Sequence, residues 1–456
     1  MESNEEETRH LITFDERMHL ALKVFGLQNM KSDNNWFLNC AIQMVWNTLS
    51  LRKLMFEYHN IVTDEDNPNY QFVEKLKELF SIVEKAKIEK FMREIKIYDL
   101  YPLRNVLEDS NQGTNRFNME EMADAGEAYG ELLDLILQDL AMLGKQQKLK
   151  EIVGIPLEKH YTWVCGKKQV FPYDESCMML ILIWDIFISE YSVDETDDVE
   201  FLENQQGRLP EYITNHLTKE LDFHQKEHLR EWKYQPEDWK YKTLRIKNSD
   251  SQSSRSQDAC PDVISINLTW QQSSPKDVLT TLNMIPSIFQ LSNMFEISKS
   301  TENKKYYFKG MIWYWGLHYF WFIRHITRDG EYWMEFNDKE VFMIPNWCDI
   351  VNDWVINWAT PTLLIFENID TVEYPDKISD LSLSSGELEE LKIKWFKNTR
   401  AARMGRVDLG SSKESSKYNN HSFHKKVSPH GQIYGHHGCK YSTIVTQAYT
   451  IIDSHV

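Results

Sequence analysis

One segment of the chain, residues 26–46, joins a polar turn directly to an apolar helical stripe. It reads GLQNMKSDNNWFLNCAIQMVW. After the turn, apolar residues recur every three or four positions: Phe37, Leu38, Ala41, Ile42, Val45 and Leu49. This spacing places them on one face of a helix that a globular protein would bury. The segment therefore predicts a core helix that begins near Trp36.

The start of this helix is a place where reactive residues are often found. Asn34 or Asn35 is expected to cap the first turn, because an asparagine side chain accepts hydrogen bonds from the free backbone amides there. Trp36 then lies at the positive end of the helix dipole. A nucleophilic cysteine is favoured at such a position, since amides and dipole lower the pKa of its thiol. Here the residue is tryptophan, which has no nucleophilic atom.

The order of residues in this segment resembles the cysteine box of the ubiquitin-specific proteases, a family in which cysteine stands at the position of Trp36. The positions that fit the box are Gly26, Leu27, Asn29, Asn34, Phe37, Leu38, Asn39, Ala41 and Gln43. Two details look most like the finger-poor branch that includes ubiquitin-specific protease 53. They are the seven-residue spacing from Asn29 to Trp36 and the presence of Trp46 at the end of the box.

Two later segments resemble further boxes of the same family, in the family's order. The run Met122-x-Asp124-Ala-x-Glu127 matches a packing helix, so Asp124 and Glu127 are interpreted as structural residues. Gly316-Leu-His-Tyr resembles the histidine box, and Trp333-x-x-Phe-Asn-Asp resembles the strand end that supplies the third catalytic residue.

The resemblance implies an α+β, papain-like cysteine protease fold, with a helical thumb-like part packed on an antiparallel β-rich palm. It assigns the base position to His318 and the third-residue position to Asn337, with Asp338 adjacent. Asn29 takes the oxyanion position, and Trp36 takes the nucleophile position in an inactive form. An imidazole oriented by an amide or carboxylate, and an amide donor to the oxyanion, are what thiol acyl transfer requires.

Three functions stay open from these residues. The preferred hypothesis is a catalytically inactive, pseudo-deubiquitinase member of the family that binds ubiquitin, a ubiquitinated protein or another protein partner. The second is an active cysteine-type deubiquitinase that hydrolyses isopeptide bonds with another nucleophile, for which Cys40, one helical turn beyond Trp36, is the candidate. The third is a scaffold that does not bind ubiquitin.

Composition narrows the class of protein. The 456 residues carry a formal net charge of −18, which disfavours nucleic acid as the main partner. The 6 cysteines form no CxxC pair, which indicates a reduced, intracellular chain, in the cytoplasm or the nucleus. The acidic amino terminus lacks the pattern of a secretory signal. The apolar run from Met178 to Ile188 is too short to span a membrane.

The sequence predicts no cofactor and no metal site. Many members of the family carry a zinc-binding finger with two CxxC pairs, but this chain offers only Cys165, Cys177 and His160 in the corresponding region. Four ligands at zinc spacing are missing, so we expect no zinc-binding finger. Histidines and Cys439 near the carboxyl terminus also lack the spacing of a zinc site.

The expected organisation is a flexible acidic lead-in over residues 1–20, a protease-like domain over 21–370 and a low-complexity, partly helical tail over 371–456. A polar stretch, 203–258, is interpreted as an exposed insertion in the domain. The tail is a possible site for a protein partner. Within the domain, the patterns predict the following elements: helices in 70–97, 119–143 and 274–283, strands at 263–270 and 291–297, and an antiparallel sheet in 306–368. A helix over 388–406, with Ser384 or Ser385 near its cap, begins the tail.

Overall fold

The computed structural model describes residues 26–27, 29, 34–57, 68–85, 100–110, 117, 123–163, 166, 168–172, 178–184, 199–217, 239–246, 260–270, 274–297, 303–316, 318–338, 340–344, 346–357 and 359–403. The predicted lead-in lies outside these residues, as does the end of the predicted tail. Among them, no helix has both the length and the apolar character needed to cross a membrane.

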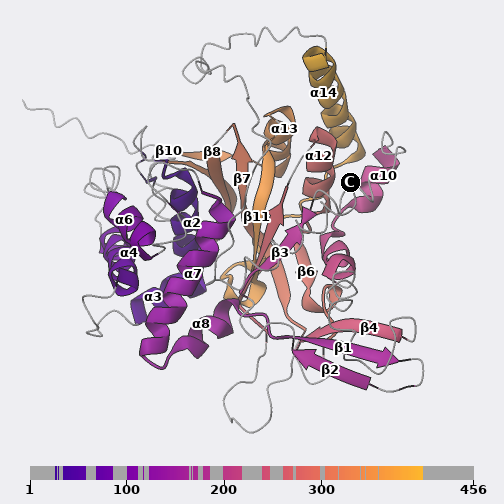
Figure 1. Ribbon diagram of the computed structural model, residues 1–456. Coiled ribbons are helices and arrows are strands. Elements are labelled where there is room, and N and C mark those ends of the chain that lie inside the picture. Colours follow the sequence, from indigo (N-terminus) through magenta and orange to yellow (C-terminus); the bar gives the residue numbers. More distant parts are fainter. Residues whose placement is uncertain are drawn as a thin grey trace, which may run out of the picture.

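The amino-terminal part of the domain is a group of helices, drawn in indigo and purple at the left of Figure 1. They are α2 (Trp36–Asn47), α3 (Leu49–Glu57), α4 (Pro68–Lys85), α6 (Tyr101–Ser110), α7 (Ala125–Met142) and α8 (Gln146–Val153). The predicted core helix is α2, and it is buried on every side from Phe37 to Asn47. It is buried beyond its apolar stripe because α7 and strand β8 both pack against it.

A large sheet forms the centre of the molecule (Figure 1). Its strand order is β10-β9-β8-β7-β11-β5-β3, and β6 pairs with β7 outside this path. The strands are β3 (Leu180–Ile183), β5 (Val263–Thr269), β6 (Ile288–Gln290), β7 (Lys305–Trp315), β8 (His318–Thr327), β9 (Gly330–Asn337), β10 (Glu340–Ile344) and β11 (Thr360–Asn368). All pairs are antiparallel except β3 with β5. The predicted antiparallel sheet in 306–368 is confirmed.

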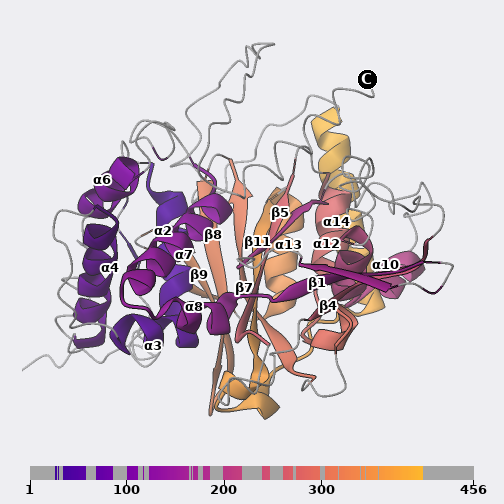
Figure 2. The same ribbon diagram turned by 60° about the horizontal axis from the view of Figure 1, so that its bottom comes forward.

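Helices also cover the opposite face of this sheet, at the right of Figure 1, so the sheet is the middle layer of the fold (Figure 2). They are α10 (Val199–Gln205), α12 (Pro275–Met284), α13 (Trp347–Asn357) and α14 (Ser385–Arg403), with short 3-10 turns at Leu291–Asn293, Ile369–Thr371 and Pro375–Lys377. One hydrophobic cluster fills each side of the sheet. Two buried layers on one sheet explain why its strands read as nearly continuous apolar runs.

A smaller, three-stranded sheet in the order β2-β1-β4 extends to one side, at the lower right of Figure 1. Its strands are β1 (Leu157–Trp163), β2 (Lys168–Pro172) and β4 (Trp239–Ile246). His160 lies here, and its Nε2 is 3.1 Å from Glu158 Oε2. Cys165 and Cys177 lie outside the described residues. Within the described ranges, no three His, Cys, Asp or Glu side chains are grouped so as to hold a metal ion.

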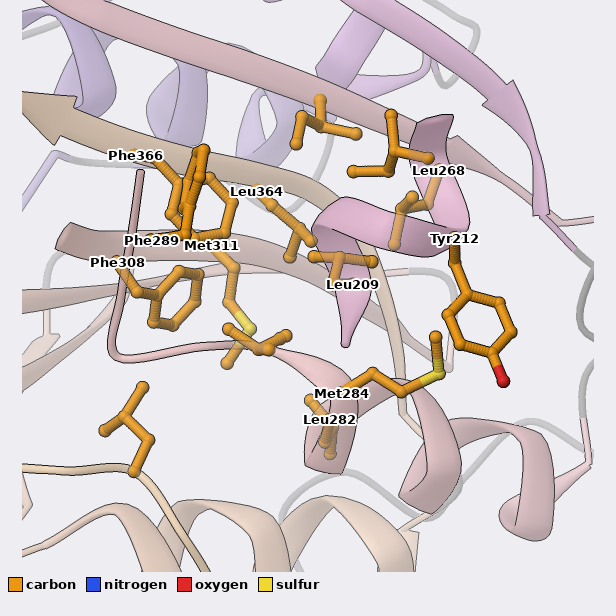
Figure 3. Close-up of a cluster of buried hydrophobic side chains, with 14 of the residues drawn as sticks. Leu209, Tyr212, Leu268, Leu282, Met284, Phe289, Phe308, Met311, Leu364 and Phe366 are labelled. Carbon is orange, nitrogen blue, oxygen red and sulfur yellow. The ribbon is translucent and has the colours of Figure 1, made fainter. Parts of the chain in front are cut away.

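The prediction that 203–258 is an exposed insertion is wrong for its described part. Residues 209–217 are helical, and Leu209, Tyr212 and Ile213 are buried in the cluster on the α12 side of the large sheet. Figure 3 shows Leu209 and Tyr212 among the side chains of that cluster. Strand β4 pairs with β1. Leu209, Tyr212, Ile213 and Leu217 follow helical spacing, but they lie among polar residues, and the polar composition outweighed this signal in the prediction.

The predicted tail also begins later than 371. Leu381, Leu383, Leu388 and Leu391 are buried in the same cluster. The helix α14 starts as predicted: the Ser384 hydroxyl accepts from the Glu387 amide, and Glu387 Oε2 accepts from Ser384. This reciprocal pair is a capping box. The first turns of α14 therefore belong to the domain.

Two further segments, 291–297 and 347–357, differ from their predicted secondary structure. Residues 291–297 begin with a 3-10 turn, because Asn293 Oδ1 accepts from the Gln290 amide and closes the backbone into a turn. The helix α13 went unpredicted inside the β-rich region, although Trp347, Ile350, Val351, Trp354 and Val355 follow helical spacing and are buried.

We expect Gly310→Ala to lower the free energy of unfolding by about 1–3 kcal/mol. A Cβ at Gly310 would lie 2.2 Å from the backbone oxygen of Phe322 on β8, which has no room to move without disturbing the sheet. Gly386→Ala is the matched control, because a Cβ there meets no atom within 4 Å. Urea-induced unfolding of both variants measures the difference, and equal stability would contradict the close packing of β7 on β8.

Glu335→Gln is expected to stabilise the protein at pH 7.5, on the order of 1–3 kcal/mol. Burial, with Asp353 nearby, raises the pKa of Glu335 to about 7. The folded state therefore holds this proton to a higher pH than the unfolded state, and stability falls as the pH rises from about 4.5 to 7. Glutamine does not titrate, so the variant lacks this pH-dependent contribution to the free energy of unfolding. Unfolding free energies measured across this pH range should be flatter for Glu335→Gln than for the wild type.

Candidate functional site

The sheet brings His318 and Asn337 together. His318 is the first residue of β8, and Asn337 is the last residue of the neighbouring antiparallel strand β9. Their side chains meet with His318 Nε2 3.0 Å from Asn337 Oδ1. A carbonyl oxygen only accepts, so this contact places the ring proton on Nε2 and leaves Nδ1 as the basic nitrogen. The predicted base and third residue are thus in hydrogen-bonding contact.

Asp338 joins this pair to the amino-terminal segment. It lies in the tight turn between β9 and β10 with a φ of 51°, the left-handed conformation that such two-residue turns require. Its Oδ2 accepts from Asn29 Nδ2 at 3.1 Å, and its Oδ1 accepts from Asn39 Nδ2 at 2.6 Å. Its backbone oxygen accepts from the Leu27 amide at 2.9 Å. One residue therefore fixes the position of the segment that precedes α2.

The electrostatics of Asp338 reflect two opposing effects. Burial raises the pKa of its carboxyl group above the usual range, whereas His318, Asn29 and Asn39 act in the opposite direction. Asp338 Oδ2 lies 3.9 Å from His318 Nε2. An ion pair with a protonated imidazole is thus available, while Asn337 makes the closer contact.

Trp36 occupies the start of α2 and faces the imidazole. The centroids of the Trp36 and His318 rings are 5.4 Å apart, with an angle of 68° between their planes, an edge-to-face arrangement. The indole is half-buried, and its Nε1 has no hydrogen-bond acceptor among the described residues. Indole nitrogen is a donor only, so it neither accepts the imidazole proton nor attacks a carbonyl. An aromatic ring therefore lies where the sequence predicts the nucleophile position.

Asn29 is held by hydrogen bonds at both ends of its amide. Its Oδ1 accepts from the Asn35 backbone amide at 3.0 Å, and its Nδ2 donates to Asp338. Asn29 thus holds the first turn of α2 in place. The side chain of Asn35, the N-cap residue, makes no capping hydrogen bond. Of the two predicted capping residues, Asn34 or Asn35, Asn35 stands at the N-cap but does not cap through its side chain; its backbone amide donates to Asn29 instead. An oxyanion role for Asn29 stays a prediction.

Cys40 lies on the same helix in a different environment. Its side chain is 4% exposed, and burial, together with the negative charge of Asp338, raises the pKa of its thiol well above the usual range. A nucleophilic cysteine requires the opposite shift. The thiol of Cys40 is therefore protonated near neutral pH.

Three contributors to the site were not assigned roles from the sequence. Asn39 binds Asp338, and its signal was a row of polar residues at four-residue spacing, Asn39, Gln43 and Asn47, on a helix that is otherwise largely apolar. Tyr319 donates to Asp124 Oδ2 at 3.0 Å, which fixes β8 to the start of α7 one residue after His318. Phe320 contacts the imidazole edge to face at a centroid distance of 4.5 Å. Asp124 also caps α7, as its predicted structural use requires.

We expect Asp338→Ala to destabilise the start of α2 and to lower the free energy of unfolding by about 1–3 kcal/mol, because the buried amide of Asn39 and the half-buried amide of Asn29 lose their acceptor. Hydrogen exchange of the backbone amides in 35–40 should accelerate. Asp349→Ala, at an exposed position in the first turn of α13, is the control. Unchanged exchange in Asp338→Ala would show that other contacts hold this segment.

A family model matches most of the chain, and two solved structures show a more distant similarity. The family model described as ubiquitin carboxyl-terminal hydrolase matches residues 25–355. The Saccharomyces cerevisiae Pan2 pseudoubiquitin hydrolase-RNA exonuclease module, solved with AAGGAA RNA, matches with a TM-score of 0.48 and 14% identity, over 79% of this chain and 55% of that chain. The SAGA Ubp8/Sgf11/Sus1/Sgf73 DUB module bound to ubiquitin aldehyde matches with a TM-score of 0.45 and 15% identity, over 77% and 70%.

This chain thus spans about half of the Pan2 chain that it matches. A search of curated proteins gave no match. The family match covers most of the described chain, including the segment before α2 and strands β8 and β9, and it confirms the expected papain-like fold of helices packed on an antiparallel sheet. The chain belongs to the ubiquitin carboxyl-terminal hydrolase family.

Proposed function

We propose that this chain is a catalytically inactive member of its family, a pseudo-deubiquitinase that acts by binding. The observation that carries the proposal is the edge-to-face contact of Trp36 with His318, at the start of α2. Hydrolysis by this family's chemistry needs a thiol beside the imidazole, and an indole supplies none. Within the family, the sequence pattern favours the finger-poor branch that includes ubiquitin-specific protease 53.

The environment of Cys40 argues against an active enzyme with a substitute nucleophile. Its thiol is buried and its pKa is raised. Moving it to the imidazole would require a shift of α2 by about one turn, roughly 5 Å along the axis. That shift would break the contacts of Asn39 with Asp338 and of Trp36 with His318.

The proposed partner is ubiquitin or a ubiquitinated protein. Support comes from membership of the family and from the hydrogen bonds that keep the site assembled although it has no nucleophile: His318 with Asn337, and Asp338 with Asn29. A protein partner of the carboxyl-terminal tail, and a location in the cytoplasm or the nucleus, are further parts of the proposal.

Two measurements on the purified full chain test the proposal together. Calorimetric titration with ubiquitin and with di-ubiquitins measures binding, and incubation with ubiquitin that carries a carboxyl-terminal electrophile measures covalent capture. Binding without capture is expected. Capture of the wild type would overturn the inactive assignment, and Cys40→Ser would then identify the thiol. A fold-competent protein that binds none of the ubiquitins would overturn the proposed partner and favour a scaffold.

Trp36→Cys is expected to gain covalent capture by the electrophilic probe, because a thiol at this position would face the imidazole that Asn337 orients. The double variant Trp36→Cys with Cys40→Ser is the matched control and should be captured equally well. Adding His318→Ala should slow capture by about 10²–10⁴-fold, since the general base is lost. No capture by a well-folded Trp36→Cys protein would count against an intact remainder of the site.

A further inference from the structure

The helix α13 has two different flanks on the large sheet. On one flank, Asn352 accepts from Lys394 Nζ of α14 at 2.8 Å, so that side is covered. Asp353 is the next residue of α13, about 100° further around the helix. Its negative charge contributes to the raised pKa of Glu335 on β9. Strand β10 is the terminal strand of the large sheet on this side, beyond β9.

Strand β10 forms the edge of the large sheet and pairs with β9 alone among the described strands. Val341 and Met343 pack on the cluster that contains α2, so Glu340 and Phe342 point to the face that carries α13. Phe342 is 46% exposed. A free strand edge with an exposed aromatic side chain is a site at which another extended segment can pair.

Glu335 lies directly opposite Phe342 in the sheet. Its side chain is half-buried and lies near a like charge, Asp353. No hydrogen-bond donor or cation pairs with it within the described ranges. A half-buried carboxylate of this kind costs stability until a cation or donor pairs with it. This unpaired carboxylate distinguishes the surface from an ordinary solvated edge.

We propose that the β10–α13 strip, defined by Glu335, Glu340, Phe342 and Asp353, binds an extended basic segment of a partner protein. The segment pairs with β10 through its backbone, packs an aliphatic side chain on Phe342 and places a lysine or arginine at Glu335 and Asp353. Charge complementarity selects a basic segment, because every ionisable side chain of the strip is acidic. This surface does not depend on the proposed ubiquitin binding.

The test uses the full chain and a fluorescein-labelled decapeptide that alternates lysine and valine, followed by fluorescence anisotropy. We expect saturable binding that weakens as salt rises. A peptide of equal charge with proline in place of each valine should bind about tenfold more weakly or worse, since proline cannot donate to β10. Equal binding of the two peptides would show that non-specific electrostatic attraction explains the binding, and it would overturn the proposal.

Variants locate the binding on the chain. Glu335→Gln and Phe342→Ser should each weaken binding about five- to tenfold, roughly 1–1.4 kcal/mol. The matched controls on α14 are Glu389→Gln, an exposed carboxylate, and Ile393→Ser, whose side chain is 45% exposed. Because Glu335→Gln is expected to be more stable than the wild type, unfolding would not explain its loss of binding. Unchanged affinity in both strip variants would overturn the proposal.

Zero-length carbodiimide coupling, read by mass spectrometry, distinguishes other occupants. Coupling of Glu335 or Asp353 to a peptide lysine supports the proposal. Coupling of Glu335 to a lysine of the same chain would show that the chain's own segment covers the strip, and coupling to a second copy would show self-association. Either result would overturn the assignment to a partner protein.

Discussion

The assembly of this site depends on one half-buried carboxylate. Asp338 accepts hydrogen bonds from the side chains of Asn29 and Asn39, and its backbone oxygen accepts from Leu27. These contacts link two parts of the chain that are about 300 residues apart. Hydrogen bonds to a charged acceptor are stronger than neutral ones, and they are costly to break when buried. The helical layer and the sheet are therefore held in register at the point where Trp36 meets His318.

The hydrogen bonds that hold the site do not include the residue at the start of α2. The histidine is oriented by Asn337, and β8 is fixed to α7 through Tyr319 and Asp124. None of these contacts involves the residue at the start of α2, so replacing a small side chain there by an indole leaves them in place. The geometry of these residues is thus independent of the side chain at the start of α2.

Much of the site could be predicted from the sequence because local patterns encoded it. The apolar spacing from Phe37 to Val45 identified α2, and the histidine and Asn-Asp boxes identified the ends of two strands. The role of Asn39 could not be predicted, since it depends on a contact with Asp338 from the far end of the domain. The capping of the first turn of α2 was not predicted correctly for a similar reason. Asn29, from the preceding loop, accepts a hydrogen bond from the backbone amide of Asn35. Leu209, Tyr212 and Ile213 follow helical spacing, but the polar residues around them led to the interpretation of an insertion, and the burial of Leu381 depends on contacts with distant parts of the chain.

The position of β11 has a consequence for biosynthesis. This strand lies between β7 and β5, yet it comes after both in the chain. While the ribosome makes the protein from its amino terminus, β5 and β7 cannot be joined into one sheet until the residues up to Asn368 have emerged. Two strand edges remain unpaired until then, and such edges favour association between chains. The domain should therefore depend on protection by chaperones during synthesis, and truncation before β11 should yield aggregates rather than a smaller folded unit.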